Sequence, residues 1–403
     1  MLADASRARL RVLHATPAFA PAYRYGGPIR SVEGLVVELA RSGVDVRVLT
    51  TDADGVDRLR MGRGWQTWRG VPVRYLPRWA QPDLAPAFLW EAYVQAKQSD
   101  VGHVMSLFST PSMVSLAAFE LAGKPVVLSP RGALEPAALK VASARKKHAW
   151  LRAFAPLLRR TTLFHATSNT EAASITRVLG AEVRVRVVPN GTDLEPRETA
   201  MARKARAPSI PKIGSLGRIH PIKALERLVE AAVILRARGV DLELELAGPP
   251  QDEAYLAELR RRAERPALAG RVRFPGELAA EAKFDFLAGC RVLCLPSRSE
   301  NFGNVVVEAL SCMTPVVTSR GTPWEELETL GAGRWVDNAP AALADALEPY
   351  LRDALLSAQA GERGRDLVER CYSWTAVAGA MRGVYEEAVH LGAGGGSLTN
   401  GRD

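Results

Sequence analysis

The sequence predicts an α/β protein built from two tandem doubly wound domains with a cleft between them. The chain has 403 residues, which exceeds the size at which a single hydrophobic core stops growing. Short apolar runs of strand length alternate with amphipathic segments of helix length, which is typical of βαβ units and a parallel sheet. A stretch rich in Pro, Ala and basic residues, 195–211, divides these units into two series and reads as a linker.

Each series supplies the strands of one Rossmann-like domain. The first strands read LRVLHA, DVRVLT, PVRYL, GHVMSL, PVVLS, LFHAT and VRVVP, and the later ones KIGSLG, LELELAG, VRFPG, VLCLP and PVVTS. We expect domains over residues 1–200 and 208–375, a C-terminal helix over 376–392 that packs back toward the first domain, and a flexible Gly-rich tail over 393–403. Such sheets bind ligands at the carboxyl ends of their strands, so the expected site lies in the cleft between the domains.

The composition indicates an ordinary globular protein with an acidic partner. The chain is 47% hydrophobic and 24% charged, which is ordinary for a globular protein, and its formal charge of +9 favours an acidic partner such as nucleotide phosphates, anionic lipid or nucleic acid. No apolar run approaches the roughly 20 residues that span a bilayer, and the first residues lack the apolar region of a signal peptide. We therefore expect a cytoplasmic protein. The four cysteines lack the partners of a zinc site and are assigned to packing.

Two carboxylates, Glu300 and Glu308, lie in the segment PSRSENFGNVVVEAL, directly after a predicted buried strand. Glu300 would fall in the turn between strand and helix, and Glu308 inside the helix. Backbone N–H groups at such a helix start can bind the hydroxyls and phosphates of a ligand. A surface-loop acid followed by a solvated helix acid would give the same spacing, so this pair alone leaves the role open.

The residues around this pair resemble the E-x7-E region of the retaining glycosyltransferases of family 4, glycogen-synthase-like enzymes with two Rossmann-like domains. The matching residues are Pro296-Ser297, Glu300, Phe302-Gly303, Glu308-Ala309-Leu310 and Pro315-Val316-Val317. The resemblance implies that Glu300 and the backbone of Phe302 and Gly303 hold the donor sugar, with Asn301 in the same turn, and that Glu308 binds the ribose hydroxyls. The first domain would then bind the acceptor and the second the nucleotide sugar.

The segment GSLGRIHPIK places Gly217, Arg218 and Lys223 after a strand and at the opening of a helix. Two fixed cations there could neutralise a diphosphate leaving group without a metal, or they could be solvated charges at a helix end. The segment resembles the G-R-x4-K element of the same family, in which Arg and Lys stabilise the departing nucleotide. Ala224 stands where family members usually have Gly. Arg218, Lys223 and Glu300 are the predicted catalytic residues.

The first domain offers three further candidate sites. Gly26-Gly27 follows the first strand and resembles the glycine-rich loop of the family that faces the donor phosphate, although a tight turn before a helix is the alternative. Arg131, in SPRG at a strand end, could bind acceptor or phosphate, or form a structural salt bridge. Many relatives have an H-x-H pair where this chain has His103 and Met105, so His103 is either an acceptor-side residue or a buried core histidine.

Two other segments bear on partners. Residues 145–160 combine many cations with Trp150 and Phe154, which is typical either of a helix on an anionic membrane surface or of an ordinary helix whose aromatic rings enter the core. Asp52-Ala53-Asp54 could be mistaken for a metal-binding D-x-D, but it follows a strand at a probable turn, where Asp usually makes turn hydrogen bonds. We predict no metal and no other cofactor.

The sequence therefore predicts a retaining glycosyltransferase that moves a sugar from a nucleoside-diphosphate sugar to a hydroxyl of a glycan or lipid-linked acceptor. The elements SPRG, HATS and GTPWEEL resemble those of family members that build bacterial surface polysaccharides, which implies a role in polysaccharide biosynthesis. Contact of residues 145–160 with anionic lipid would place the protein on the inner face of the cell membrane. Two alternatives stay open: a sugar-nucleotide epimerase of similar fold, and a non-enzymatic basic protein that binds nucleic acid, for which no recognisable motif is present.

Overall fold

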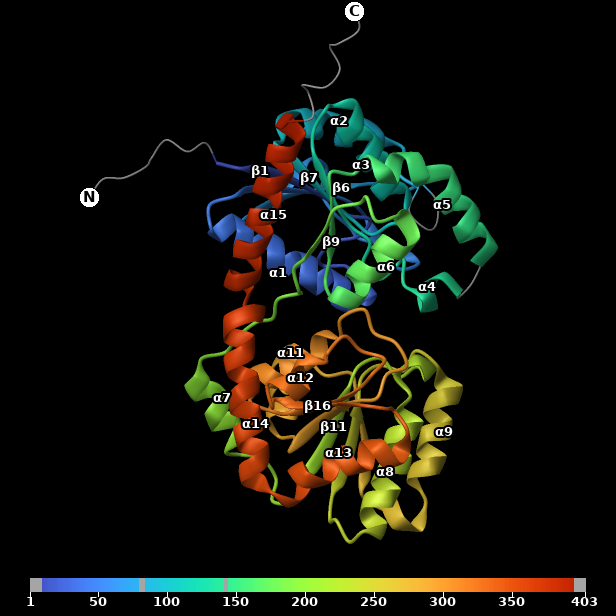
Figure 1. Ribbon diagram of the computed structural model, residues 1–403, viewed down its shortest axis with the longest axis vertical. Coiled ribbons are helices and arrows are strands. Elements are labelled where there is room, and N and C mark those ends of the chain that lie inside the picture. The colour runs from blue at the N-terminus through green and yellow to red at the C-terminus, as the bar shows by residue number, and fades with distance from the viewer. Residues whose placement is uncertain (1–8, 80–83, 141–143, 395–403) are drawn as a thin grey trace, which may run out of the picture. The chain divides into compact units, whose positions relative to one another are not determined.

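A computed structural model describes residues 9–79, 84–140 and 144–394 (Figure 1). The chain divides into two compact units, the first formed by residues up to Gly191 together with those from Trp374 onward, and the second by Thr192–Ser373. The chain crosses between the units after Gly191 and after Ser373, whereas the domains expected from the sequence ended at 200, began at 208 and ended at 375. The second unit is thus inserted, in sequence, into the first.

The expected linker is wrong for part of its length, because residues Arg197–Lys204 form helix α7 and pack in the second unit. Arg203 donates hydrogen bonds to Glu195 at 2.9 Å and to Glu281 at 2.6 Å. The buried Lys204 ammonium donates to the carbonyl of Cys290 at 2.6 Å and to the hydroxyl of Thr314 at 2.9 Å. Basic residues that read as a linker in the sequence therefore anchor a helix.

The first unit is built on an eight-stranded sheet with the order β10-β9-β8-β7-β1-β2-β6-β5, in which β5 alone pairs antiparallel. The strands are β1 (Arg11–Ala15), β2 (Asp45–Thr51), β5 (Trp65–Trp68), β6 (Val71–Leu76), β7 (Val101–Met105), β8 (Val126–Ser129), β9 (Leu163–Ala166) and β10 (Val185–Val187), and β3 (Ala53–Asp54) and β4 (Asp57–Arg58) form a separate hairpin. The helices are α1 (Gly27–Arg41), α2 (Ala87–Gln98), α3 (Thr110–Leu121), α4 (Pro136–Lys140), α5 (Ala144–Arg159), α6 (Asn169–Leu179) and α15 (Trp374–Gly394), with a 3-10 turn at Tyr23–Tyr25.

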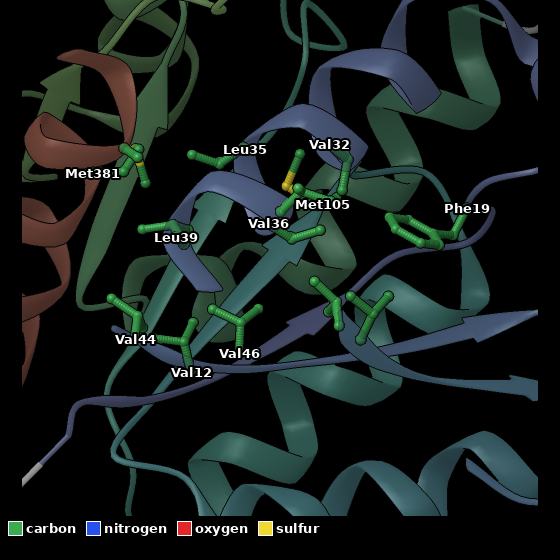
Figure 2. Close-up of a cluster of buried hydrophobic side chains, with 14 of the residues drawn as sticks. Val12, Phe19, Val32, Leu35, Val36, Leu39, Val44, Val46, Met105 and Met381 are labelled. Atoms are coloured by element: carbon green, nitrogen blue, oxygen red, sulfur yellow. The ribbon is translucent and has the colours of Figure 1, made fainter. Parts of the chain in front are cut away.

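One core of this unit lies between the sheet and the helices α1 and α15, which lie side by side (Figure 1). Val32, Leu35, Val36 and Leu39 recur at helical spacing on the buried face of α1, as Figure 2 shows. Met381 of α15 joins the same cluster. The expected C-terminal helix is therefore present in the first unit and slightly longer than 376–392, while residues 395–403 of the expected tail lie outside the described residues.

The second unit is built on a six-stranded parallel sheet with the order β13-β12-β11-β14-β15-β16. Its strands are β11 (Lys212–Leu216), β12 (Glu243–Ala247), β13 (Val272–Gly276), β14 (Val292–Leu295), β15 (Val316–Ser319) and β16 (Gly333–Val336). Its helices besides α7 are α8 (Leu225–Ala237), α9 (Glu253–Ala263), α10 (Ala280–Ala288), α11 (Asn304–Ser311), α12 (Glu326–Thr329), α13 (Pro340–Arg352) and α14 (Ala354–Leu367), with 3-10 turns at Pro221–Lys223 and Pro266–Leu268 and a π-helical turn at Val368–Tyr372.

Both sheets reverse their strand order at one point, as doubly wound sheets do. In the first unit the reversal lies between β1 and β7, and in the second it lies between β11 and β14. Loops that leave two such strands in opposite directions open a crevice at the carboxyl end of the sheet, where ligands bind. The predicted class of two doubly wound domains is confirmed.

Candidate functional site

The switch point of the second unit brings together two of the segments singled out in the sequence. The chain leaves β11 into the loop with Arg218 and Lys223, and leaves β14 into the loop with Glu300. The backbone N–H of Arg298 donates to the carbonyl of Ile222 at 2.8 Å, which ties the two loops together. The second sheet therefore places the predicted phosphate element and the first predicted carboxylate side by side.

Lys223 and Glu300 form an ion pair at this point, with side chains that are 16% and 14% exposed. The Glu300 carboxylate also accepts a hydrogen bond from the Ser297 hydroxyl at 2.7 Å, and its backbone N–H donates to the carbonyl of Gly321 at 2.9 Å. A lysine ammonium has three N–H donors, and the ion pair uses one of them. Lys223 can therefore bind an anion while it still holds Glu300.

Arg218 lies in the same loop but is solvent-exposed, and it makes no ion pair or side-chain hydrogen bond within the described residues. A guanidinium has five donors in a planar fork that matches the oxygen atoms of phosphate. Arg218 thus offers an unoccupied anion-binding group within five residues of Lys223. Its exposure also fits the alternative reading, a solvated charge at a helix end.

Glycine is required where this loop leaves β11. Gly217 has φ +156°, and a Cβ built there would lie 3.7 Å from Cε of Lys223. A Cβ on Gly248, which follows β12, would lie 1.9 Å from the carbonyl oxygen of Gly217. Ala224, the departure from the family pattern, adopts a left-handed φ of 50° that glycine adopts without steric cost. Ala224 therefore adopts a backbone conformation that suits glycine, the residue usual in the family at this position.

The turn between β14 and α11 offers backbone groups more than side chains. The side chain of Phe302 is 5% exposed, and its ring centroid lies 5.0 Å from that of Trp324. Gly303 has φ +82° and stands at the start of α11. Asn301 lies half-buried in the same turn. Any contact of Phe302 and Gly303 with a ligand would therefore be made by the peptide backbone at a helix start.

Glu308 lies in α11 and accepts a hydrogen bond from the ammonium of Lys283 in α10 at 2.8 Å. The two side chains are 20% and 22% exposed, so the carboxylate is held by a cation and still reaches solvent. Sequence reasoning missed Lys283, because nothing in the spacing of the α10 segment signals a partner 25 residues further along the chain. Ser297, Gly321 and Trp324 were missed as site residues for the same reason, since only the folded sheet places them beside Glu300 and Phe302.

In the first unit, Gly26 lies between β1 and α1, and Gly27 is the first residue of α1. Gly26 has φ +75° and precedes the first residue of the helix, and a Cβ built on it would meet nothing within 4 Å. The positive φ favours glycine even though the surroundings are open. The requirement for glycine at Gly26 therefore comes from its backbone conformation and not from a close neighbour.

Arg131 follows β8 with a left-handed φ of 56°, which is unusual for a residue other than glycine. Its Nη1 donates to Asn190 at 2.5 Å, and its Nε is buried without a hydrogen-bond partner in the described residues. Among the described residues, no carboxylate lies within ion-pair distance of Arg131. The structural salt bridge considered from the sequence is therefore not found among them. Burial lowers the pKa of Arg131, which is the direction expected for a cation without a paired anion.

His103 belongs to a buried row of hydrogen bonds that crosses neighbouring strands. Its Nε2 lies 2.7 Å from the Ser129 hydroxyl, which lies 2.6 Å from Nδ1 of His165. Its Nδ1 lies 2.8 Å from the hydroxyl of Tyr385 in α15, which lies 3.0 Å from Nε2 of His14. We call these five residues the histidine row.

The direction of the hydrogen bonds between His165 and His103 follows from one end of the row. Nε2 of His165 lies 2.7 Å from the carbonyl of Val188, and a carbonyl only accepts, so this nitrogen carries the proton. Ser129 then donates to His165 and His103 donates to Ser129, so Nδ1 of His103 accepts, with the Tyr385 hydroxyl at 2.8 Å and Nε2 of His14 at 3.2 Å as its two neighbours. Burial lowers the pKa of His14 and His165 to about 3, so the row is uncharged at neutral pH.

The row decides between the two readings of His103. The side chain is fully buried and both ring nitrogens are hydrogen-bonded, so it offers no exposed atom to an acceptor. Met105, which stands at the second position of the H-x-H pair of the family, is 2% exposed and packs beneath α1 (Figure 2). The structure thus favours the core interpretation of His103. His14, Ser129, His165 and Tyr385 were not anticipated, because they come together only across the sheet.

Helix α5 carries the basic and aromatic residues considered for membrane contact. The ring of Trp150 lies 4.9 Å from that of Phe108 and 4.6 Å from that of Phe154, so the aromatic side of the helix packs within the unit. Its cations Arg145, Lys146, Arg152 and Arg159 are exposed. The packing of the rings is the one expected for an ordinary helix, whereas the outer face keeps its positive charge.

The described residues contain no group of three or more His, Cys, Asp or Glu side chains arranged to hold a metal ion. Asp52 accepts a hydrogen bond from the backbone N–H of Arg78 at 3.0 Å, and Asp54 lies in the hairpin and forms an ion pair with Arg24 at 3.7 Å. Both aspartates therefore have structural partners, but these partners, Arg78 and Arg24, lie far along the chain, so the expected hydrogen bonds within a turn are not the ones observed. None of the described helices combines the length and the apolar character needed to cross a bilayer.

Comparison with known proteins gives the same division of the chain. The family model described as "Glycosyl transferase 4-like domain" matches residues 26–191, and the one described as "Glycosyl transferases group 1" matches residues 196–367. The D-inositol 3-phosphate glycosyltransferase of Paenarthrobacter aurescens is 28% identical over 94% of this chain and 97% of its own length. D-inositol 3-phosphate glycosyltransferase 2 of Catenulispora acidiphila is 30% identical over 56% of this chain, and this chain spans only 56% of that relative.

Among solved structures, Anabaena Alr3699/HepE in complex with UDP resembles the chain with a TM-score of 0.73 at 19% identity, covering 94% of this chain and all of that one. Two doubly wound units with these motifs define the GT-B class of glycosyltransferases. The chain belongs to family 4 of that class.

Proposed function

We propose that the protein is a retaining glycosyltransferase that moves a sugar from a nucleoside-diphosphate sugar to a hydroxyl of a glycan or lipid-linked acceptor. The observation that carries the proposal is the pairing of Lys223 with Glu300 at the switch point of the second sheet, beside the unpaired Arg218. This arrangement combines cations for a leaving diphosphate with a carboxylate for sugar hydroxyls. Retention of configuration rests on the resemblance of the E-x7-E and G-R-x4-K segments to family 4.

In this proposal Arg218 and Lys223 act on the leaving group. Negative charge grows on the diphosphate oxygen as the bond to the sugar breaks, and fixed cations stabilise that charge more in the transition state than in the bound substrate. Lys223 is already oriented by Glu300, so it loses little freedom when the diphosphate binds. The two cations supply the charge that a metal would otherwise provide, and we propose that no metal or other cofactor is needed.

The remaining residues of the second unit bind the donor. Glu300 and the backbone of Asn301, Phe302 and Gly303 hold the sugar, Gly217 lets the diphosphate approach the backbone, and Glu308 binds the ribose. The Lys283 ammonium holds the Glu308 carboxylate in place at 2.8 Å, where the carboxylate still reaches solvent. The complex of Anabaena Alr3699/HepE with UDP supports a nucleotide ligand for this fold, and the base and sugar of the present donor are to be found by a binding panel.

The first unit receives the acceptor in this proposal. Gly26 and Gly27 approach the donor phosphate, and Arg131 binds a polar or anionic group of the acceptor through donors that no carboxylate occupies. The named relatives act on D-inositol 3-phosphate, which carries a phosphate, and this supports an anionic acceptor group. His103 contributes through the histidine row, by fixing the strands around Arg131, and does not contact the acceptor itself.

We further propose a role in polysaccharide biosynthesis in the cytoplasm, at the inner face of the cell membrane. The exposed cations of α5 would attract anionic lipid headgroups, each contributing on the order of 1 kcal/mol near the surface. Because Trp150 and Phe154 pack within the unit, this contact is electrostatic and reversible. No role for nucleic acid is included.

A thermal-shift panel of UDP-, GDP- and ADP-sugars tests the donor, because a ligand that binds only the folded state raises the Tm by mass action. Incubation of the selected donor alone then separates the reaction classes. A transferase gives at most slow hydrolysis without acceptor, whereas an epimerase converts the sugar. Stabilisation by no nucleotide sugar, or epimerisation of the donor, would contradict the proposal, and the anomeric configuration of the transfer product decides retention.

A further inference from the structure

The loop that carries Glu300, Phe302 and Gly303 is held along one side by the turn between β15 and α12, residues 319–324, which we call the support turn. The carbonyl of Gly321 accepts a hydrogen bond from the N–H of Glu300 at 2.9 Å. The indole Nε1 of Trp324 donates to the carbonyl of Phe302 at 2.5 Å. The Ser319 hydroxyl donates to the carbonyl of Ser297. The loop is therefore fixed by bonds to its backbone near both ends and in the middle.

The support turn lies so close to the loop that only glycine fits at its nearest point. A Cβ built on Gly321 would lie 2.5 Å from the carbonyl oxygens of both Ser297 and Arg298. Real side chains essentially never approach backbone atoms this closely, and the backbone of the loop could not move away without losing the bonds above. The close approach fixes the distance between turn and loop.

Trp324 sets the orientation of one peptide group in the loop. Its side chain is 1% exposed, and its ring lies 5.0 Å from that of Phe302 and 5.4 Å from that of Tyr372, so the indole has no freedom to turn. An indole N–H only donates, so it holds the Phe302 carbonyl toward the core. In a trans peptide the carbonyl and the following N–H point in opposite directions. The N–H of Gly303 therefore points away from Trp324, and it makes no hydrogen bond within the described residues.

We propose that Trp324 is a positioning residue for the donor sugar: it locks the peptide between Phe302 and Gly303 so that the Gly303 N–H faces the ligand. This inference rests on the proposed function, because it assigns the free N–H to the sugar part of the nucleotide sugar. The diphosphate is held elsewhere, by Arg218 and Lys223. Loss of the indole N–H should consequently weaken binding of the nucleotide sugar and leave binding of the nucleoside diphosphate unchanged.

The test compares Trp324→Phe with Tyr372→Phe by calorimetric titration. Both variants keep an aromatic ring and remove one polar group of the same aromatic cluster, but the Tyr372 hydroxyl donates to Glu326 and does not touch the loop. The probes are UDP-glucose and UDP, or GDP-mannose and GDP if the wild type selects guanine. In Trp324→Phe we expect the Kd of the nucleotide sugar to rise about tenfold and the Kd of the nucleoside diphosphate to stay within about twofold of wild type. In Tyr372→Phe we expect both Kd values to stay within about twofold of wild type.

The possible results distinguish a failure of the positioning role of Trp324 from a failure of the proposed function. Equal weakening of both ligands, or no change in Trp324→Phe, would overturn the positioning role alone, because the wild type would still bind the donor. A wild type that binds no nucleotide sugar would overturn the proposed function and this inference together. If Trp324→Phe does not fold, replacement of Trp324 by β-(3-benzothienyl)alanine, which keeps the ring shape and removes the N–H, provides the same comparison.

Discussion

Replacing Lys223 by alanine removes the cation that pairs with the carboxylate of Glu300 and that we assign to the diphosphate. Both side chains are mostly buried, at 16% and 14% exposure, so water screens their charges only partly. Two unit charges about 4 Å apart interact by about 4 kcal/mol at an effective dielectric constant near 20. Only the part that grows in the transition state affects turnover, and loss of one preorganised donor typically costs about 100- to 1000-fold in rate. We expect Lys223→Ala to lower kcat by that factor.

The same substitution should lower the free energy of unfolding by only about 1 to 3 kcal/mol, because Glu300 keeps the hydrogen bond from Ser297. Lys212→Ala is a matched control, since Lys212 is also a mostly buried lysine of the second unit. Its ammonium lies 3.0 Å from the Glu245 carboxylate, and it is not part of the loops that carry Lys223 and Glu300. Urea titration reports stability, and steady-state kinetics with the donor chosen by the panel reports kcat and KM. Wild-type turnover in Lys223→Ala, or an equal loss of kcat in Lys212→Ala, would refute the assignment of Lys223 to the leaving group.

Three further outcomes are expected. Glu308→Ala should raise the donor Kd about tenfold with a smaller effect on kcat, and unchanged affinity in calorimetry would remove Glu308 from the site. The folded-state pKa of His14 and of His165 lies below the value of about 6.5 in the unfolded chain, so the unfolded chain binds more protons than the folded one as the pH falls from about 6.5 toward 3. The free energy of unfolding should therefore drop by about 1 kcal/mol per histidine between pH 7 and pH 5.5. A urea midpoint that is equal at pH 7 and pH 5.5 would contradict this. Reversing the charge of Arg145 and Arg152 to Glu should abolish sedimentation with anionic liposomes at low salt, whereas wild-type protein that does not sediment would exclude the membrane contact.

Local patterns were enough to predict most of the strands and the class of two doubly wound domains, although β3, β4, β5 and β16 were not foreseen. Each candidate loop follows its strand directly in the sequence: Gly217, Arg218 and Lys223 come just after β11, and Glu300 comes just after β14. A strand, a turn and a helix start could therefore be recognised in each segment. The linker failed because a helix as short as α7 is stabilised by its packing, through Arg203 and Lys204, and not by a hydrophobic pattern of its own.

The parts that could not be predicted depend on side chains brought together by the sheet. Lys283 meets Glu308 across two helices, and Trp324 meets Phe302 across two neighbouring strands. The histidine row combines residues from four strands and the C-terminal helix, and no single segment carries a signal for it. His103 illustrates the difference: its alternation with Met105 indicated a buried strand, but only its partners show why a polar side chain is tolerated there.

The discontinuous first unit has a consequence for how the chain folds during synthesis. Helix α15 supplies Met381 to the core beneath α1 and the Tyr385 hydroxyl to His14 and His103, yet it is translated only after the whole of the second unit. Until then the nascent first unit lacks the apolar side chains that α15 adds to the core beside α1, and it leaves His14 and His103 without the Tyr385 hydroxyl. The second unit, which is continuous in sequence, can close its own core as soon as it leaves the ribosome, so it should complete its fold before the unit that precedes it.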